Sequence, residues 1–154
     1  MNIINDFFIF GAKYLFILSI IIAGWYFFKQ LRSTKREMII FGLIVAIVAG
    51  VIAFIVGHLY YDPRPFIVDH FTPLIPHADD NGFPSDHTLL VGAIASIIFV
   101  YNRRISLYLW IIAIAVGISR VYVGVHHTID IIGSIIITIF ATYIVHLFWR
   151  KYRK

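Results

Sequence analysis

The sequence predicts an all-α protein that crosses a membrane several times, built as one domain with about five transmembrane helices. Three observations predict this fold class: 60% of the 154 residues are hydrophobic, only 14% are charged, and the apolar residues gather in five runs separated by polar segments. A soluble domain carries about 25% charged residues, and a soluble fold of this size would leave too much apolar surface in water. The composition therefore excludes a typical soluble enzyme, a disordered chain and a coiled coil. Because the chain has no cysteine, it also excludes disulfides and cysteine nucleophiles.

An apolar run of about 20 residues crosses the hydrocarbon core of a bilayer as a helix. In chain order, the predicted helices are residues 7–28, 38–61, 85–101, 105–119 and 129–149. The first follows a segment that has no basic residue and contains Asp6, so we expect a retained helix and no cleavable signal peptide. The third and fourth are short for full spans, and we expect their outer ends to lie below the membrane surface, inside protein.

The basic residues predict the orientation of these helices. Ten of the 13 Lys and Arg residues lie between the first two helices, between the third and fourth, or after the fifth: Lys29, Arg32, Lys35, Arg36, Arg103, Arg104, Arg150, Lys151, Arg153 and Lys154. Excess Lys and Arg mark the cytoplasmic face, so the N-terminus is predicted outside and the C-terminus in the cytoplasm. Residues 62–84 and 120–128 are then outside. The net charge of +5 reflects topology and attraction to anionic lipids, and no nucleic-acid partner is expected.

The first candidate for chemistry is the stretch from Ser119 to Asp130. His126 and Asp130 are four residues apart, and if the fifth helix starts near His126 their Cβ atoms lie about 5–6 Å apart on one face. A carboxylate there can accept the proton of one imidazole nitrogen and leave the other nitrogen free to attack. Arg120, at the end of the preceding helix, can bind phosphate oxygens through two N–H groups.

The second candidate is the start of the third helix. Ser85 suits its N-cap, and the free amides of the first turn attract anions. His87 in the same turn can hand a proton to a leaving oxygen. Asp86 either helps to cap the helix or contacts His87. With the guanidinium of Arg64, these residues are the parts for phosphoryl transfer without a metal.

Together these residues resemble the type 2 phosphatidic acid phosphatase superfamily, which also includes the vanadium haloperoxidases. Its motifs are Lys-x6-Arg-Pro, Pro-Ser-Gly-His and Ser-Arg-x5-His-x3-Asp. The third motif is matched in full by Ser119, Arg120, His126 and Asp130. The second is matched with Asp86 in place of Gly, by Pro84, Ser85 and His87. The first is matched only by Arg64 and Pro65, because Gly57 stands where the family has Lys.

Within that superfamily the chain is most similar to bacterial undecaprenyl-diphosphate phosphatases of the bacitracin-resistance type. The similarity lies in residues 61–66 (YDPRPF), 74–78 (LIPHA) and 83–88 (FPSDHT). That subgroup also uses Pro-Ser-Asp-His and can lack the first-motif Lys. Lys13, in the first helix, is a candidate substitute for that Lys.

The resemblance implies a mechanism as well as a fold. His126 would be the nucleophile that forms a phosphohistidine, and Asp130 would orient it. His87 would protonate the leaving group and then activate water. The phosphate would be held by the remaining candidates, with Asp86 beside them: Arg64, Arg120 and Ser85. No metal and no cofactor are expected.

The implied substrate is a polyprenyl diphosphate, cleaved to the monophosphate and phosphate at the outer face of the cell membrane. The motif residues bind phosphate and do not specify the lipid tail. Phosphatidylglycerol phosphate, phosphatidic acid and a sphingoid phosphate therefore remain as alternative substrates. A non-catalytic transporter or lipid-binding protein is the rival from another class. The oligomeric state is open.

Other polar residues have plainer interpretations. Four histidines are expected to be interfacial or structural: His58, His70, His127 and His146. A metal site formed by His77, Asp79 and Asp80 is a weaker hypothesis, because a solvated loop does not specify ligand geometry.

Overall fold

The computed structural model describes residues 2–152, and nearly all of its regular structure is helical. The helices are, in chain order, α1 (Ile3–Phe28), α2 (Arg32–Leu59), α3 (Pro65–Val68), α4 (Asp86–Tyr101), α5 (Arg103–Tyr122) and α6 (Thr128–Tyr152). All five predicted helices are present, and α3 is a short addition in the loop that follows α2. The predicted fold class is confirmed. Arg153 and Lys154, counted above among the basic residues, lie outside the described residues.

Four helices in the described part of the chain are long and apolar enough to cross a membrane, namely α1, α2, α5 and α6. The expectation that the fourth predicted helix is short was wrong, because Arg103, Arg104 and residues 120–122 are also helical and α5 reaches 20 residues. The helix α4 is short, with 16 residues. Large apolar side chains cover the outside of the bundle, as expected of a multi-pass membrane protein.

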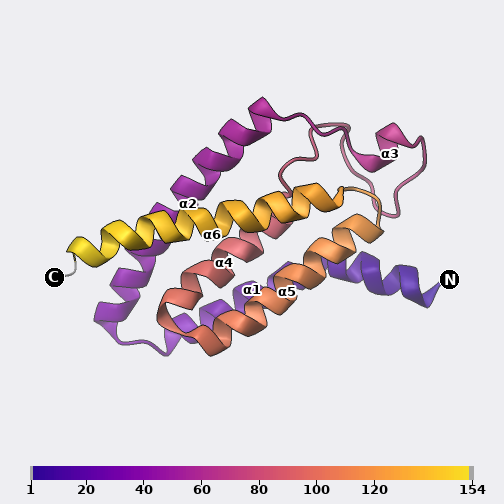
Figure 1. Ribbon diagram of the computed structural model, residues 1–154. Coiled ribbons are helices and arrows are strands. Elements are labelled where there is room, and N and C mark those ends of the chain that lie inside the picture. The colour runs from indigo at the N-terminus through magenta and orange to yellow at the C-terminus, as the bar shows by residue number, and fades with distance from the viewer. Residues whose placement is uncertain (1, 153–154) are drawn as a thin grey trace.

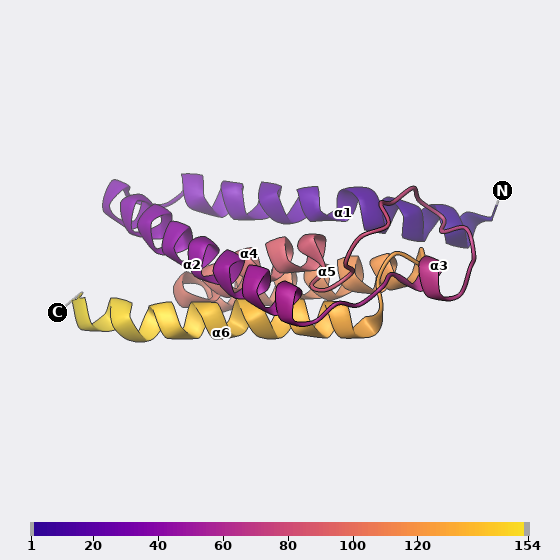
Figure 2. The same cartoon turned by 90° about the horizontal axis from the view of Figure 1, so that it is seen from above.

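The short helix α4 lies at the centre of the bundle and packs against α1, α2, α5 and α6. Figure 2 shows α4 and α5 between α1 and α6, with α2 crossing obliquely towards α6. Small residues permit these close contacts: Gly92 of α4 faces Thr138 of α6, so closely that a Cβ would lie 2.8 Å from the Thr138 hydroxyl. The Ser106 hydroxyl donates to the carbonyl of Ala95, which ties α5 to α4 at 2.8 Å.

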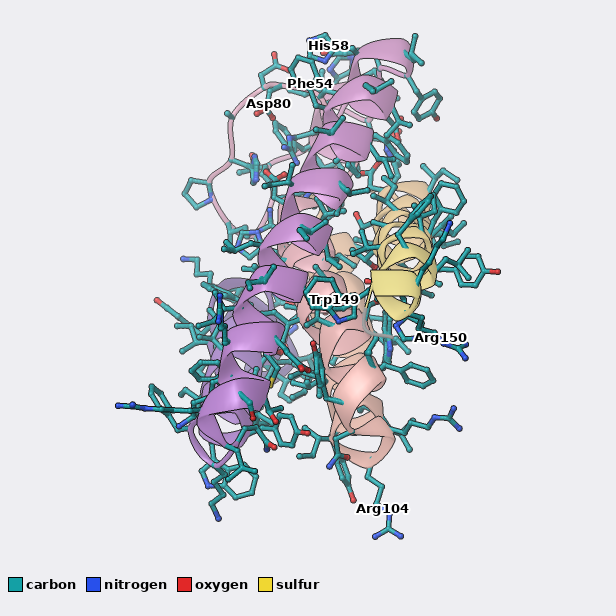
Figure 3. The ribbon with its side chains drawn as sticks, turned by 90° about the vertical axis from the view of Figure 1, so that its left-hand side faces the viewer. Phe54, His58, Asp80, Arg104, Trp149 and Arg150 are labelled. Carbon is teal, nitrogen blue, oxygen red and sulfur yellow. The ribbon has the colours of Figure 1, made fainter. Side chains whose placement is uncertain are left out.

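The two connections predicted to carry the chemistry meet at one end of the bundle. The loop from α2 to α4, which includes α3, lies beside the α5–α6 turn at the end where α1 begins (Figure 1). The Leu74 amide donates to the carbonyl of Val123, which joins the two connections. The α4–α5 turn, next to Arg104, lies at the opposite end (Figure 1). Figure 3, which is viewed from that opposite end, shows Asp80 and His58 at the top of the view and Arg104 at the bottom.

The side chain of Asn81 closes the long loop on itself. Its amide group donates to the carbonyls of Gly57, at 2.7 Å, and Tyr60, at 3.1 Å. Its carbonyl oxygen accepts from the backbone N–H groups of Asp62 and Phe83. Both ends of the loop are therefore held against the end of α2, which fixes the segment that carries Arg64.

Candidate active site

His126 lies at the centre of the predicted residues, in the turn between α5 and α6. Its side chain is only 3% exposed. One ring nitrogen, Nε2, lies 3.4 Å from Nη1 of Arg64 and 3.4 Å from Nη2 of Arg120. The other, Nδ1, lies 3.1 Å from Oδ2 of Asp130. Residues from the α2–α4 loop, the end of α5 and the start of α6 thus converge on one imidazole.

Asp130 reaches His126 in a different way from the one expected. The helix α6 begins at Thr128, so His126 lies outside it and the pair does not share a helix face. Asp130, in the first turn and fully buried, points backwards and accepts the N–H of His127 at 2.9 Å. This is a capping contact, which acidic residues favour at helix starts. The same carboxylate oxygen then faces Nδ1 of His126, so a proton on Nδ1 leaves a lone pair on Nε2.

The surroundings of His126 favour its neutral form. Burial lowers the pKa of His126, and the positive charges of Arg120 and Arg64 lower it further, while the hydrogen bond to Asp130 acts in the opposite direction. A neutral imidazole with its proton on Nδ1 is the form that can attack an electrophile through Nε2.

Arg64 is buried and does not extend to the surface, although a snorkelling arginine would do so. Its Nε donates to Oδ1 of Asp80 at 2.7 Å, and its Nη1 donates to the carbonyl of Val125 at 2.7 Å. A further contact joins Nη2 to the carbonyl of Asn81. Pro65 occupies the first position of α3, where a missing N–H costs nothing. The guanidinium is therefore fixed before any ligand arrives.

Arg120 lies in the last turn of α5 and is also buried, with 3% of the residue exposed. Its Nη2 lies 2.9 Å from Nε2 of His77, and its Nε is buried without a partner in the described part of the chain. Burial and the charges of Arg64 and Arg120 lower the pKa of His77. The imidazole of His77 is therefore neutral at pH 7 and accepts the hydrogen bond from Arg120.

His77 is not among the site residues predicted from the sequence, where it appears only in the weaker hypothesis of a metal site with Asp79 and Asp80. The structure directs His77 to Arg120 and Asp80 to Arg64, and the group of possible metal ligands found among the described residues does not include these three. The signal that would have found His77 is the stretch Leu-Ile-Pro-His-Ala, which carried part of the family resemblance without a role assigned to its histidine.

The start of α4 lies beside this cluster. Ser85 is fully buried at the N-cap position, but its hydroxyl caps no backbone amide and instead accepts from Thr88 at 3.2 Å. The backbone N–H of Ser85 faces the carbonyl of Asp130 at 3.5 Å, and the Ser134 hydroxyl donates to the Ser85 carbonyl. The first turn of α4 is thus attached to the first turn of α6.

His87 and Asp86 are near the cluster but not joined to it. His87 packs edge-on against the ring of Phe16, with 5.3 Å between ring centroids, and lies within electrostatic range of Arg120 and His126. Asp86 is exposed and acts on His87 and Arg120 through its charge. Neither makes a side-chain hydrogen bond within residues 2–152. Arg64, Arg120, His126 and Asp130 are therefore the predicted residues whose side chains the structure brings into direct contact, and Ser85 reaches Asp130 through the backbone.

Gly57, which stands where the family has Lys, is packed against the loop after α2. A Cβ on Gly57 would lie 3.1 Å from the carbonyl oxygen of Phe83, and the carbonyl of Gly57 already accepts from Asn81. Lys13 is exposed on α1 and, among the described residues, has no hydrogen bond or ion pair with the cluster. The structure thus gives no support to Lys13 as a substitute.

Comparisons with known proteins agree with this arrangement. Residues 37–154 match the PAP2 superfamily. Undecaprenyl-diphosphatase BcrC of Bacillus subtilis is 32% identical over 140 residues, which cover 90% of this chain and 71% of the relative. Bacitracin transport permease protein BcrC of Bacillus licheniformis is 37% identical over 121 residues, which cover 77% of this chain and 58% of the relative.

A solved structure confirms the fold independently. The crystal structure of Aquifex aeolicus LpxE has a TM-score of 0.74 over 94% of this chain and 86% of that one, at 21% sequence identity. At this identity the likeness shows the fold alone, and the helix arrangement described above is similar to that of LpxE. The family match and the first relative are what decide membership. The chain therefore belongs to the PAP2 superfamily.

Proposed function

We propose that the protein removes the terminal phosphate of a polyprenyl diphosphate and leaves the lipid monophosphate. PAP2 membership and the undecaprenyl-diphosphatase relative support the coarser statement that it is a membrane lipid-phosphate phosphatase. The observation that carries the proposal is the position of His126: Nε2 lies 3.4 Å from two guanidiniums, and Nδ1 is held by a buried carboxylate. The nucleophilic nitrogen of His126 therefore lies next to two positive groups that can bind a phosphate.

Substrate binding is assigned to the two arginines. A terminal phosphate between Arg64 and Arg120 accepts charge-assisted hydrogen bonds, and its phosphorus then lies next to Nε2 of His126. Because Arg64 is fixed by Asp80 and by backbone carbonyls, it needs little reorganisation when charge develops in the transition state. The buried start of α4, at Ser85, supplies a further positive helix end.

In the first chemical step, Nε2 of His126 attacks phosphorus, and a P–N bond forms as the P–O bond to the lipid monophosphate breaks. His87 gives its proton to the departing oxygen. The proton on Nδ1 stays in its hydrogen bond to Asp130, whose negative charge stabilises the positively charged phosphohistidine. In the second step, His87 takes a proton from water, the resulting oxygen attacks phosphorus, and the P–N bond breaks to release phosphate and neutral His126.

The same arrangement supports a site on the outer face of the cell membrane. The site lies at the end of the bundle opposite to the α4–α5 turn, next to Arg104 (Figure 1), and the basic segments that mark the cytoplasmic side lie at that opposite end. The lipid tail would remain in the bilayer while its phosphates meet the arginines.

The test is phosphate release by the purified protein from three lipids: undecaprenyl diphosphate, phosphatidylglycerol phosphate and phosphatidic acid. The wild type is expected to prefer the diphosphate, to remain active with a chelator, and to give an acid-labile phosphorylated protein on rapid quenching. His126→Ala is expected to be inactive. His58→Ala is the matched control, because His58 is exposed and, among the described residues, its only hydrogen bond is with the carbonyl of Phe54 on its own helix.

Each part of the proposal has its own contradicting result. Preference for phosphatidylglycerol phosphate or phosphatidic acid would overturn the substrate, and activity in His126→Ala would overturn the nucleophile. Loss of wild-type activity with the chelator would overturn the metal-free chemistry. Failure to release phosphate from all three lipids would overturn the phosphatase function itself.

A further inference from the structure

A second acidic side chain lies beside Asp130, and the mechanism above does not use it. Asp62 precedes Arg64 by two residues in the loop after α2, and its side chain is 14% exposed. Ligand atoms of Asp62, His127 and Asp130 all lie within 4.8 Å of one another. Oδ2 of Asp62 is 3.2 Å from Nδ1 of His127. Two further titratable groups, Asp62 and His127, therefore lie close to the carboxylate of the His126–Asp130 pair.

The backbone holds Asp62 in this place from both sides. The N–H of Gly82 donates to the carbonyl of Asp62 at 2.8 Å, and the N–H of Asp62 donates to the side chain of Asn81 at 2.9 Å. A Cβ on Gly82 would lie 3.0 Å from Oδ2 of Asp130 and 3.1 Å from the Asp62 carbonyl. Glycine at this position thus lets the loop approach the start of α6.

The hydrogen bonds of Asp130 leave one oxygen unaccounted for. Its Oδ2 accepts the N–H of His127 and faces Nδ1 of His126. Its Oδ1 is buried and accepts no hydrogen bond in the described residues. Oδ2 of Asp62 is also buried without a hydrogen bond there, although Nδ1 of His127 lies 3.2 Å away. Buried polar atoms without partners are rare and costly, and two ionised carboxylates this close repel each other. A single proton shared by the two carboxyl groups gives the buried oxygens a hydrogen bond and removes the repulsion between two negative charges.

Asp130 already has two N–H groups directed at it, which stabilise its ionised form, so the proton belongs on the other partner. We propose that Asp62 is a positioning residue that stays protonated and donates a hydrogen bond to Asp130, which holds that carboxylate in line with Nδ1 of His126. The inference rests on the role of Asp130 in the proposed function. It extends the site to a residue outside the three family motifs quoted above.

The electrostatic setting of Asp62 agrees with the geometry. Burial raises the pKa of Asp62, and the hydrogen bond and negative charge of Asp130 raise it further. Among the groups that act on Asp62, only His127 lowers its pKa. Two carboxyl groups that share a proton titrate as a unit, with one proton lost at lower pH and the other at higher pH. In this pair, Asp62 is the group that keeps its proton to higher pH.

The kinetic test compares two substitutions of the same residue. Asp62→Asn keeps the shape and an N–H donor for Asp130, so its kcat is expected to stay within about threefold of the wild type. Asp62→Ala removes the donor and is expected to lower kcat by tenfold or more, with KM nearly unchanged, as losses of outer supporting residues do. The decline of wild-type activity at high pH that comes from ionisation of Asp62 is expected to be absent from Asp62→Asn. Asp69→Ala, an exposed acid in the same loop, is the control.

Two kinetic results would overturn the proposal. Wild-type kcat in Asp62→Ala would show that the donor is not needed. Equal damage in Asp62→Asn and Asp62→Ala would show that Asp62 is needed as an anion, for instance to hold a cation with His127 and Asp130.

A spectroscopic test does not depend on catalysis, so it separates this proposal from the proposed function. Infrared spectra of the detergent-solubilised wild type at pH 7 are expected to contain a protonated carboxyl C=O band that disappears in Asp62→Asn and persists in Asp69→Asn. Absence of an Asp62-dependent band would overturn the shared proton, even in a fully active enzyme. Presence of the band in a protein without phosphatase activity would support the proton and leave only the proposed function contradicted.

Discussion

Arg120 donates a hydrogen bond to Nε2 of His77 across 2.9 Å, and this bond joins the last turn of α5 to the loop after α3. The guanidinium has few other constraints, because its Nε is buried without a partner in the described residues. Arg64, in contrast, is held by a carboxylate and by backbone carbonyls. His77 is therefore the group that orients the second arginine of the site.

The first prediction concerns this contact. His77→Ala is expected to lower kcat/KM about tenfold, since a hydrogen bond to a charged group contributes about 1.5–3 kcal/mol and its loss leaves Arg120 less well oriented. His77→Gln, which keeps an acceptor, is expected to recover part of the loss. Steady-state kinetics on the lipid diphosphate measure both. His70→Asn is the control, because His70 is exposed in the same loop and its φ of 52° suits asparagine; unchanged kinetics in His77→Ala would contradict the assignment.

The second prediction is a pH dependence with a definite sign. His126 must be neutral to attack, and burial together with Arg120 and Arg64 lowers its pKa. Activity on the acid side is therefore expected to persist below the pH at which an ordinary histidine, with a pKa of about 6.5, becomes protonated. Arg120→Gln removes a positive neighbour, so the pKa of His126 rises. The decline of kcat/KM towards low pH, called the acid limb here, then moves to higher pH.

The pH profile of kcat/KM measures this shift apart from the general loss of activity that a missing phosphate ligand causes. Arg104→Gln, next to the α4–α5 turn at the opposite end of the bundle (Figure 1), is expected to leave the pH of this decline unchanged. An acid limb that moves to lower pH in Arg120→Gln would mean that the limb does not report His126.

The third prediction tests the orientation of the imidazole. Asp130→Asn keeps the size of the side chain but replaces the carboxylate that faces Nδ1. The amide can direct an N–H group at Nδ1, which would favour the tautomer with its proton on Nε2, where attack must occur. A fall in kcat on the order of 10³-fold or more is expected, by analogy with other imidazole–carboxylate pairs. Single-turnover kinetics measure it, with the exposed Asp6→Asn as the control, and a kcat near that of the wild type would remove Asp130 from the mechanism.

Much of this site could be predicted from the sequence, because the motif residues lie at short, regular spacings next to helix ends. The spacing of His126 and Asp130 suggested the pair, although the geometry came from a capping turn and not from a shared helix face. The five long helices could be predicted from hydrophobicity alone, since a span must satisfy its backbone hydrogen bonds internally. Residues 105–119 were predicted too short, because charged residues at both ends of α5 are helical.

The contacts of the long loop could not be predicted. His77 and Asp62 belong to the loop that Asn81 closes onto the end of α2. That closure depends on tertiary hydrogen bonds between residues about 20 positions apart, which no periodicity in the sequence encodes. For the same reason, the sequence could not show that Gly57 is packed against the carbonyl of Phe83.

The last prediction concerns the turn that presents His126. Gly124 has a φ of +81°, a left-handed conformation that L side chains rarely adopt, and a Cβ there would also meet the ring of Phe71. Gly124→Ala therefore costs about 1–2 kcal/mol from the backbone conformation, and further free energy from displacing Phe71. Gly50→Ala is the matched control: it lies in the interior of α2 with nothing within 4 Å of its Cβ position, and alanine is the better helix former by about 1 kcal/mol. Thermal unfolding in detergent is expected to occur at lower temperature in Gly124→Ala and at the same or higher temperature in Gly50→Ala. Equal stability of the two variants would show that the α5–α6 turn does not depend on the glycine, and that His126 is held by its side-chain partners alone.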